Sequence, residues 1–213
     1  MPDGKIKLTN ITWRIRKVQV ETTKLIELRQ IIKDKKTNPV TFSARTCESI
    51  NVTQGVLNFD WRIAVSNGIE KPRWILIGFQ TNRQTTQEQN PALFDHIDLT
   101  NAYVTLNGDR YPNFDFVTNF QTNDYSILYD KFNSYGEKDG TQVNFASFKK
   151  LFPIIVLDVR RQSERLKSGV IDMMLRFNFS QGVSANTMAF ATIVSDRAYR
   201  LTSDGQNLTM LSY

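Results

Sequence analysis

The chain has 213 residues and a mass of 24.6 kDa, which suits one compact domain with a sizeable core, so we expect residues 1–213 to form a single domain. Its 27 Lys and Arg residues exceed its 21 Asp and Glu residues, and the resulting net charge of +6 permits contact with a polyanion without requiring it. A single cysteine, Cys47, excludes an internal disulfide, and a single histidine, His96, excludes a multi-histidine metal site. No apolar run reaches the roughly 20 residues of a membrane helix, and the N-terminus lacks the apolar core of a signal peptide. We therefore expect a soluble, non-secreted protein with no membrane partner.

The first patterned segment covers residues 5–20 and has a period of two, which indicates a β-strand. Ile6 and Leu8 share one parity, whereas Trp13 and Ile15 share the other, and this change near Asn10-Ile11 predicts one long strand with a bulge or bend. Residues 24–32 follow with apolar side chains at helical spacing, which predicts a short helix.

Strand patterns dominate the rest of the chain. From Leu57 to Val65 every odd position is apolar, and the run from Trp74 to Phe79 is apolar on both parities, which is typical of a strand buried on both faces. The pair Asn107-Gly108 predicts a tight turn. The full set of predicted strands lies near residues 5–20, 40–50, 57–66, 73–80, 101–107, 153–159, 170–179 and 188–201.

A helix is predicted between the fifth and sixth of these strands. Its apolar residues recur at i, i+3, i+4 and i+7 and form one stripe, made of Tyr125, Leu128, Tyr129 and Phe132. We expect the stripe to pack on the outer surface or an edge of the strand layers. A further helical turn is expected over residues 145–151.

Eight strands at this spacing, with no internal repeat or linker, predict an all-β fold. We expect an eight-stranded jelly-roll sandwich of two antiparallel sheets, with one or two short helices in the connections. The three tryptophans, Trp13, Trp61 and Trp74, lie within apolar strands and are interpreted as core or inter-sheet residues. The residues predicted to be mostly buried are Trp61, Ile63, Ile75, Ile77, Ile155, Leu157, Phe177 and Ala191.

Catalytic motifs are sparse. His96 lies between Asp95 and Asp98, either of which could orient it as a base, but no G-x-S-x-G turn supplies a nucleophile, so we favour a plain histidine at a loop-to-strand junction. Cys47 is interpreted as a small half-buried strand residue. Neither a G-x-G-x-x-G nor a P-loop motif occurs, and the calcium-loop pattern is absent. We therefore expect no enzyme activity, no catalytic residue, no cofactor and no metal; the carboxylates of the central region are interpreted as solvated loop residues, namely Asp109, Asp115, Asp124 and Asp130.

Basic residues form two clusters. The first, Arg14, Arg16 and Lys17, lies in the first predicted strand. The second mixes signs, which suits a contact between subunits better than a phosphate track. Nucleic acid is therefore expected to bind only weakly or indirectly. The candidate subunit contacts are Arg160, Arg161, Glu164, Arg165 and Lys167, and the polar loop from Thr81 to Pro91 is a second candidate contact.

Several segments, taken in order, carry a resemblance to a known family. They are EKPRWILIGFQT at 70–81, NPALFDH at 90–96, LNGDRYP at 106–112 followed by DYSILY at 124–129, and RQSERLKSGVID at 161–172, with PIIVLD at 153–158 and VSDR at 194–197 on either side of the last. In this order they resemble the C-terminal jelly roll of the double jelly-roll major capsid proteins of Polinton (Maverick) elements and adintovirus-like viruses.

This resemblance implies a structural role. In that family two jelly rolls sit in one chain, three chains form a pseudo-hexameric capsomer, and no residue is catalytic. The present chain has the length of one jelly roll, which implies either a domain of a longer protein or a stand-alone descendant. We expect a capsid-type subunit that self-assembles, with a trimer or hexamer favoured, and that also meets other capsid subunits. Its expected location is the virion, or the cytoplasm or nucleus if it is not viral. The alternative is a monomeric jelly-roll module that binds carbohydrate, peptide or nucleic acid.

Overall fold

The computed structural model describes residues 7, 9–34, 37–63, 71–83, 86, 88–136, 143–162, 171–203 and 208–212. These residues divide into two compact units. One consists of residues 1–40 together with 199–213, and the other of residues 41–198.

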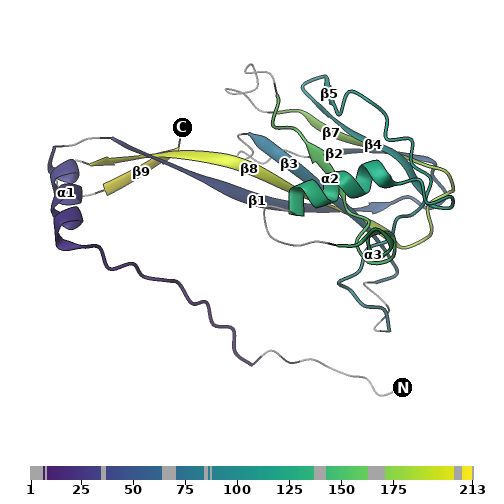
Figure 1. The fold of residues 1–213 in the computed structure, drawn as a ribbon, viewed down its shortest axis with the longest axis horizontal. Coiled ribbons are helices and arrows are strands. Elements are labelled where there is room, and N and C mark those ends of the chain that lie inside the picture. The colour runs from purple at the N-terminus through teal and green to yellow at the C-terminus, as the bar shows by residue number, and fades with distance from the viewer. Residues whose placement is uncertain are drawn as a thin grey trace. The chain divides into compact units, whose positions relative to one another are not determined.

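Two antiparallel sheets form the larger unit (Figure 1). The first sheet has the order β1-β8-β3-β6, made of β1 (Asn38–Val52), β8 (Thr187–Ser203), β3 (Pro72–Thr81) and β6 (Ile155–Asp158). The second has the order β2-β7-β4-β5, made of β2 (Asn58–Ile63), β7 (Met173–Phe179), β4 (Leu99–Leu106) and β5 (Asp109–Tyr111). This interleaving of early and late strands in both sheets is the strand order of a jelly roll, so the predicted fold is confirmed.

The core lies between the two sheets because alternate side chains of each strand point inward. In β3 the inward residues include Ile75 and Ile77, which pair across the ladder with Ile193 and Ala191 of β8. All eight residues predicted to be buried are indeed buried, each exposed by 5% or less.

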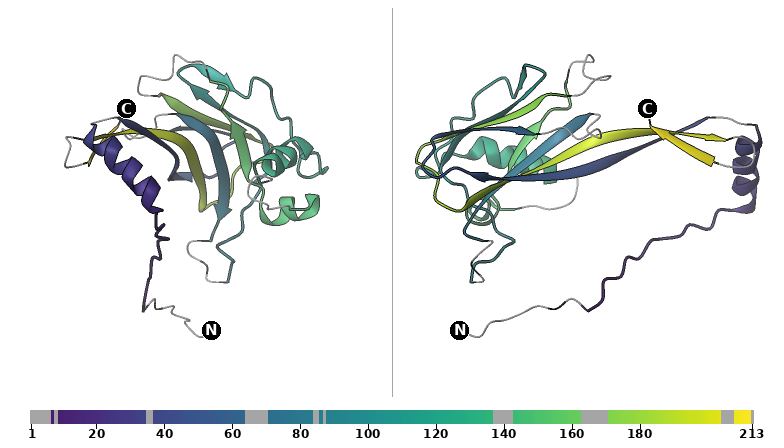
Figure 2. Two further views of the ribbon diagram at one scale, coloured as in Figure 1. Left: turned by 60° about the vertical axis from the view of Figure 1, so that its left-hand side comes forward. Right: turned by 180° about the vertical axis from the view of Figure 1, so that it is seen from behind.

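Two helices connect the sheets: α2 (Ser126–Gly136) and α3 (Phe145–Leu151), which lie next to each other beside the sandwich (Figure 2). The predicted stripe packs as expected, with Tyr125 and Leu128 buried, and Tyr129 and Phe132 partly buried against the core. The fully buried ring of Phe148 in α3 meets the three aromatic members of the stripe at centroid distances of 5.3 to 5.9 Å.

On the outer face of the first sheet, α2 covers a second, smaller apolar cluster. Trp74, Val156 and Val194 point away from the main core and pack together there. Tyr135 of α2 meets the Trp74 ring edge-on at 5.3 Å. The helix therefore shields the outside of the sheet at β3 and β6 through Tyr135 and Phe132, of which only Phe132 belongs to the predicted stripe.

The strand predicted over residues 5–20 is wrong. Within this segment the described residues 9–20 belong to no strand and are exposed, and Trp13, predicted to lie in the core, is 86% exposed. Alternation makes a segment suitable for a strand, but a strand also needs a partner, and no described strand of the chain pairs with it. The helix predicted next is present as α1 (Thr22–Lys33).

Two strands were not predicted. β5 pairs with β4 across the Asn107-Gly108 turn, where both residues have positive φ angles of 50° and 94°, as Asn-Gly hairpin turns require. The other strand, β9 (Leu208–Ser212), pairs with the last residues of β8, Tyr199 to Ser203.

Candidate assembly surfaces

Arg160, the first of the predicted subunit contacts, is engaged within the chain. Its guanidinium donates two hydrogen bonds to the Asp158 carboxylate, at 3.0 and 2.7 Å, and lies 4.2 Å from the centre of the Trp74 ring. Burial raises the pKa of Asp158, but the hydrogen bonds from Arg160 outweigh this effect and hold it below its usual value. Arg160 therefore caps the outer apolar cluster as well as facing solvent.

Arg161 differs from its neighbour. It is exposed, and it makes no ion pair with any other residue in the described part of the chain. The remaining predicted contacts, Glu164, Arg165 and Lys167, lie outside the described residues. The role of this loop as a subunit contact therefore stays a prediction, with Arg161 as its accessible described member.

The base of the polar loop from Thr81 to Pro91 is held by internal hydrogen bonds. Arg83, whose side chain is 12% exposed, pairs with Asp95 and donates to the carbonyl oxygen of Asn90 at 3.0 Å. Gln80 donates to the carbonyl oxygens of Pro91 and Leu93 at 2.8 and 2.9 Å. These bonds fix where the loop leaves β3, so any contact with a partner must use the loop beyond its base.

His96 is packed rather than poised for catalysis. Its ring stacks on Phe120 with centroids 4.6 Å apart, and its Nδ1 accepts the backbone N–H of Asp98 at 3.1 Å. Burial lowers the pKa of His96 from its ordinary value of 6.5, against the opposing pull of the Asp98 carboxylate. Among the described residues, no three His, Cys, Asp or Glu side chains gather closely enough to hold a metal ion.

β1 is an edge strand, with β8 as its one neighbour in the sheet order. Its 15 residues alternate over part of their length, with Ala44, Thr46 and Glu48 half-buried and the residues between them exposed. Cys47 is among the exposed ones, so the prediction of a half-buried cysteine is wrong. We call the side of β1 away from β8 the free edge, because no described strand pairs with it.

Residues 9–20, which we call the arm, form an extended segment (Figure 1). The large apolar side chains of the arm are exposed. Ile11, Trp13, Ile15 and Val18 are exposed by 83, 86, 68 and 84%. Such exposure of several large side chains in one segment is typical of a surface that meets a partner.

Charge is divided unevenly along the chain, a feature that the overall count did not reveal. Residues 1–40 hold 10 Lys and Arg residues against 4 Asp and Glu residues, a surplus of six. Residues 41–213 hold 17 of each and are formally neutral. The net charge of the protein therefore lies entirely in the segment that contains the arm and α1, and counting charges by segment would have shown this from the sequence.

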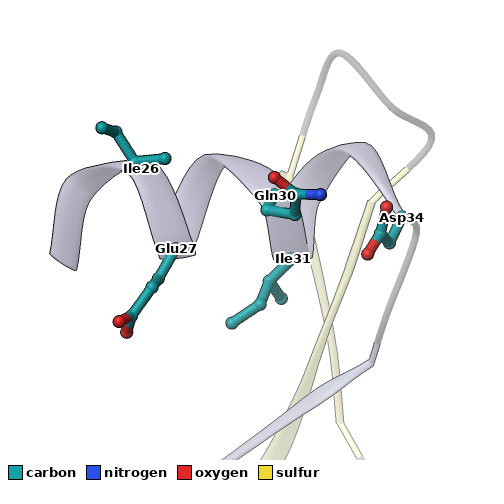
Figure 3. Close-up of a pocket in the computed structure, with 5 residues that line it drawn as sticks. All are labelled: Ile26, Glu27, Gln30, Ile31 and Asp34. Carbon is teal, nitrogen blue, oxygen red and sulfur yellow. The ribbon is translucent and has the colours of Figure 1, made fainter. Parts of the chain in front are cut away.

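A hollow on α1 is lined by Ile26, Glu27, Gln30, Ile31 and Asp34 (Figure 3). Its lining comes from one helix and the residue that caps it, and Ile26 points to a different side from Glu27 and Ile31. The hollow therefore does not converge polar groups on a ligand as a binding pocket does.

Within the described residues, no helix combines the length and apolar character needed to cross a membrane.

The strand order defines a jelly-roll protein, and comparison with known families agrees. The model of the double jelly roll-like domain family matches residues 2–199, and the chain belongs to this family. The double jelly-roll lineage is thereby confirmed, whereas the narrower assignment to Polinton elements stays a prediction. A search of curated proteins gave no match.

Among solved structures, the chain is similar to one in the 3.5 Å cryo-EM structure of the Sputnik virophage, with 10% sequence identity and a TM-score of 0.44. The alignment covers 83% of this chain and 38% of that chain, so this protein spans well under half of the length of that one.

Proposed function

We propose that this protein is a structural subunit of capsid type, which assembles with copies of itself into a cyclic trimer or hexamer and through it into capsomers or a shell. The observation that carries the proposal is the jelly-roll strand order together with the family match over residues 2–199. Residues 1–213 act as one jelly-roll domain in this proposal, other capsid subunits are further partners, and the virion is the proposed location.

The surfaces of the chain support assembly. A sandwich leaves edge strands whose backbone groups need cover, and β1 is a long one. Arg161 adds an exposed cation beside a mixed-charge loop, and mixed charges set orientation and register between partners more than affinity.

The molar mass of the purified full chain tests the proposal. Light scattering at tens of micromolar, with electron microscopy of the same sample, should give a discrete trimer or hexamer or larger closed assemblies. A monodisperse monomer in both low and high salt contradicts the proposal and favours the alternative, a monomeric binding module.

Charge reversal tests the proposed contact loop. Arg161→Glu combined with Arg165→Glu should shift the molar mass toward that of the monomer. High salt should do the same to the unmodified protein, because salt screens the contacts that charged loops make between subunits. The control, Arg29→Glu combined with Lys150→Glu, makes the same charge change at exposed positions on α1 and α3. Equal effects of the two double variants would show that net charge, not the loop, governs assembly.

A further inference from the structure

We propose that the arm is a strand donated to a second copy of this chain, where it pairs with the free edge of β1. This inference rests on the proposed self-assembly and names one contact that makes it. The partner surface is thus an extension of the first sheet of a neighbouring molecule.

The arm has the composition of a strand but lacks the partner of one. Its residues from Ile11 to Val20 are rich in Ile, Val, Thr and Trp, which favour strands, and they include no Gly or Pro. Nevertheless the arm lies outside every strand, and its large apolar side chains are exposed. Pairing with an edge would satisfy the backbone and withdraw those side chains from water in one step, as in other cases of strand addition.

The free edge of β1 is the acceptor that fits the length of the arm. β1 has 15 residues, compared with the 12 of the arm. The other edges of the same sheet are β6, which has four residues and packs against α2, and β9, which has five residues and pairs with the end of β8. The edges of the second sheet, β2 and β5, have six and three residues. β1 is therefore the one edge among the described strands that can pair with the whole arm.

The two faces of the arm match the two faces of β1. In β1 the even positions Val40, Phe42 and Ala44 are apolar, whereas the odd positions, including Cys47, are polar and exposed from Thr41 onward. In the arm Ile11, Trp13 and Ile15 would share one face of a strand and Arg14 and Arg16 the other, so the match concerns residues 11–16; beyond them Val18 and Val20 have the parity of the arginines. Residues opposite each other in paired strands lie on the same face of the sheet. Apolar pairing therefore places Arg14 and Arg16 on the face that carries Cys47.

A nucleic acid or an anionic membrane could also attract this basic segment. Strand pairing is favoured because Ile11, Trp13 and Ile15 follow a period of two, which backbone pairing uses, and because contacts with the phosphates of a nucleic acid would leave these side chains in water. Both ligands serve as competing outcomes in the experiment.

The native cysteine makes the contact testable by disulfide capture. A donor chain carries Arg16→Cys together with Cys47→Ser, and the acceptor is the unmodified full chain, whose one cysteine is Cys47. The two are given tags of different mass, mixed and mildly oxidised. We expect a donor–acceptor heterodimer on a non-reducing gel. Donors with Arg14→Cys or Arg16→Cys should cross-link several-fold more than donors with Trp13→Cys or Ile15→Cys, because they share the face of Cys47.

Ile15→Pro in the donor is the second variant. Proline removes a backbone donor and interrupts strand pairing, and Ile15 is 68% exposed, so the fold should be unaffected. This change should abolish the heterodimer and lower the oligomer mass. The control Gln19→Ala, at an exposed position of the arm, should preserve both.

Several results would overturn the inference. The first is a yield of heterodimer no higher than the yield of cross-linked dimer in donor-only and acceptor-only samples. The second is an equal yield from cysteines at odd and even positions of the arm. The third is a fast-migrating monomer from a single chain that carries Arg16→Cys and native Cys47, because such a band shows that the arm docks within one molecule. Blue-shifted Trp13 fluorescence that requires phosphatidylserine vesicles or an oligonucleotide would also overturn it. If oligomers persist while cross-linking fails, the arm contact alone is wrong, whereas a monomer by light scattering contradicts the proposed function itself.

Discussion

Gly78 shows how closely the packing depends on single atoms. A methyl group at this position in β3 would lie 2.6 Å from Cε1 of Phe94, closer than carbon atoms can approach. We expect Gly78→Ala to lower the free energy of unfolding by about 1 to 3 kcal/mol, because overpacking outweighs the gain from replacing a flexible glycine. Urea denaturation measures the change. The compensating variant Gly78→Ala/Phe94→Leu should recover part of the loss, and a Gly78→Ala protein as stable as the parent would contradict the close contact.

His96 should make stability depend on pH. Its pKa in the folded chain lies below 6.5, so between the two values the unfolded chain binds more protons than the folded one. The stability contribution is therefore present above pH 6.5 and is lost as the pH falls below it. Comparing the free energy of unfolding at pH 7.5 and 5.5 should show a decrease that is smaller in His96→Gln, and identical pH profiles would argue against this role.

At the scale of elements, α2 is held by one side chain far more than by its neighbour. Leu128 is 1% exposed, whereas Ile127 is 41% exposed on the other side of the helix. We expect Leu128→Ala to cost about 2 to 5 kcal/mol, through lost burial and the cavity left behind, and Ile127→Ala less than about 1 kcal/mol. Thermal or chemical unfolding of the two variants checks the difference, and similar costs would mean that α2 does not pack on the core as described.

The elements that the sequence predicts best are those whose environment is regular. β2, β3 and β7 have one or two buried faces, and alternation or a continuous apolar run locates each of them within a few residues. β5 is missed because three residues are too few to establish a period, and β9 because its five residues are few and its adjacent apolar residues Met210 and Leu211 break the alternation. The arm shows the opposite error, since its residue pattern is that of a strand while pairing is decided by distant parts of the chain or by another molecule.

The candidate contacts were harder to predict than the fold. Arg160 and Arg161 are adjacent and chemically identical, yet one is tied to Asp158 and stacked on Trp74 while the other is exposed. That difference arises from where β6 ends relative to β3, which no local pattern contains. Similarly, Cys47 is exposed because it lies on the outward face of β1, between the half-buried Thr46 and Glu48, and the local pattern does not show which face of the strand points outward.

For the whole molecule, the arm should be dispensable for folding. The arm contributes no buried side chain, so removing residues 9–20 should leave the midpoint of thermal unfolding unchanged in dilute solution. At high concentration the same deletion should lower the oligomer mass if the arm joins copies. Circular dichroism and light scattering of the same samples separate the two effects, and a lower midpoint in dilute solution would mean that the arm packs on its own chain.

The uneven division of charge has a colloidal consequence. Identical molecules packed side by side repel each other in proportion to the charge that each brings to the contact, and residues 41–213 bring none on balance. Copies of residues 41–213 packed in one layer would therefore repel each other only weakly. The surplus of six positive charges attracts counterions to residues 1–40. Proteolysis or phosphorylation there would shift the isoelectric point of a whole assembly and leave the chemistry of the packed sheets unchanged.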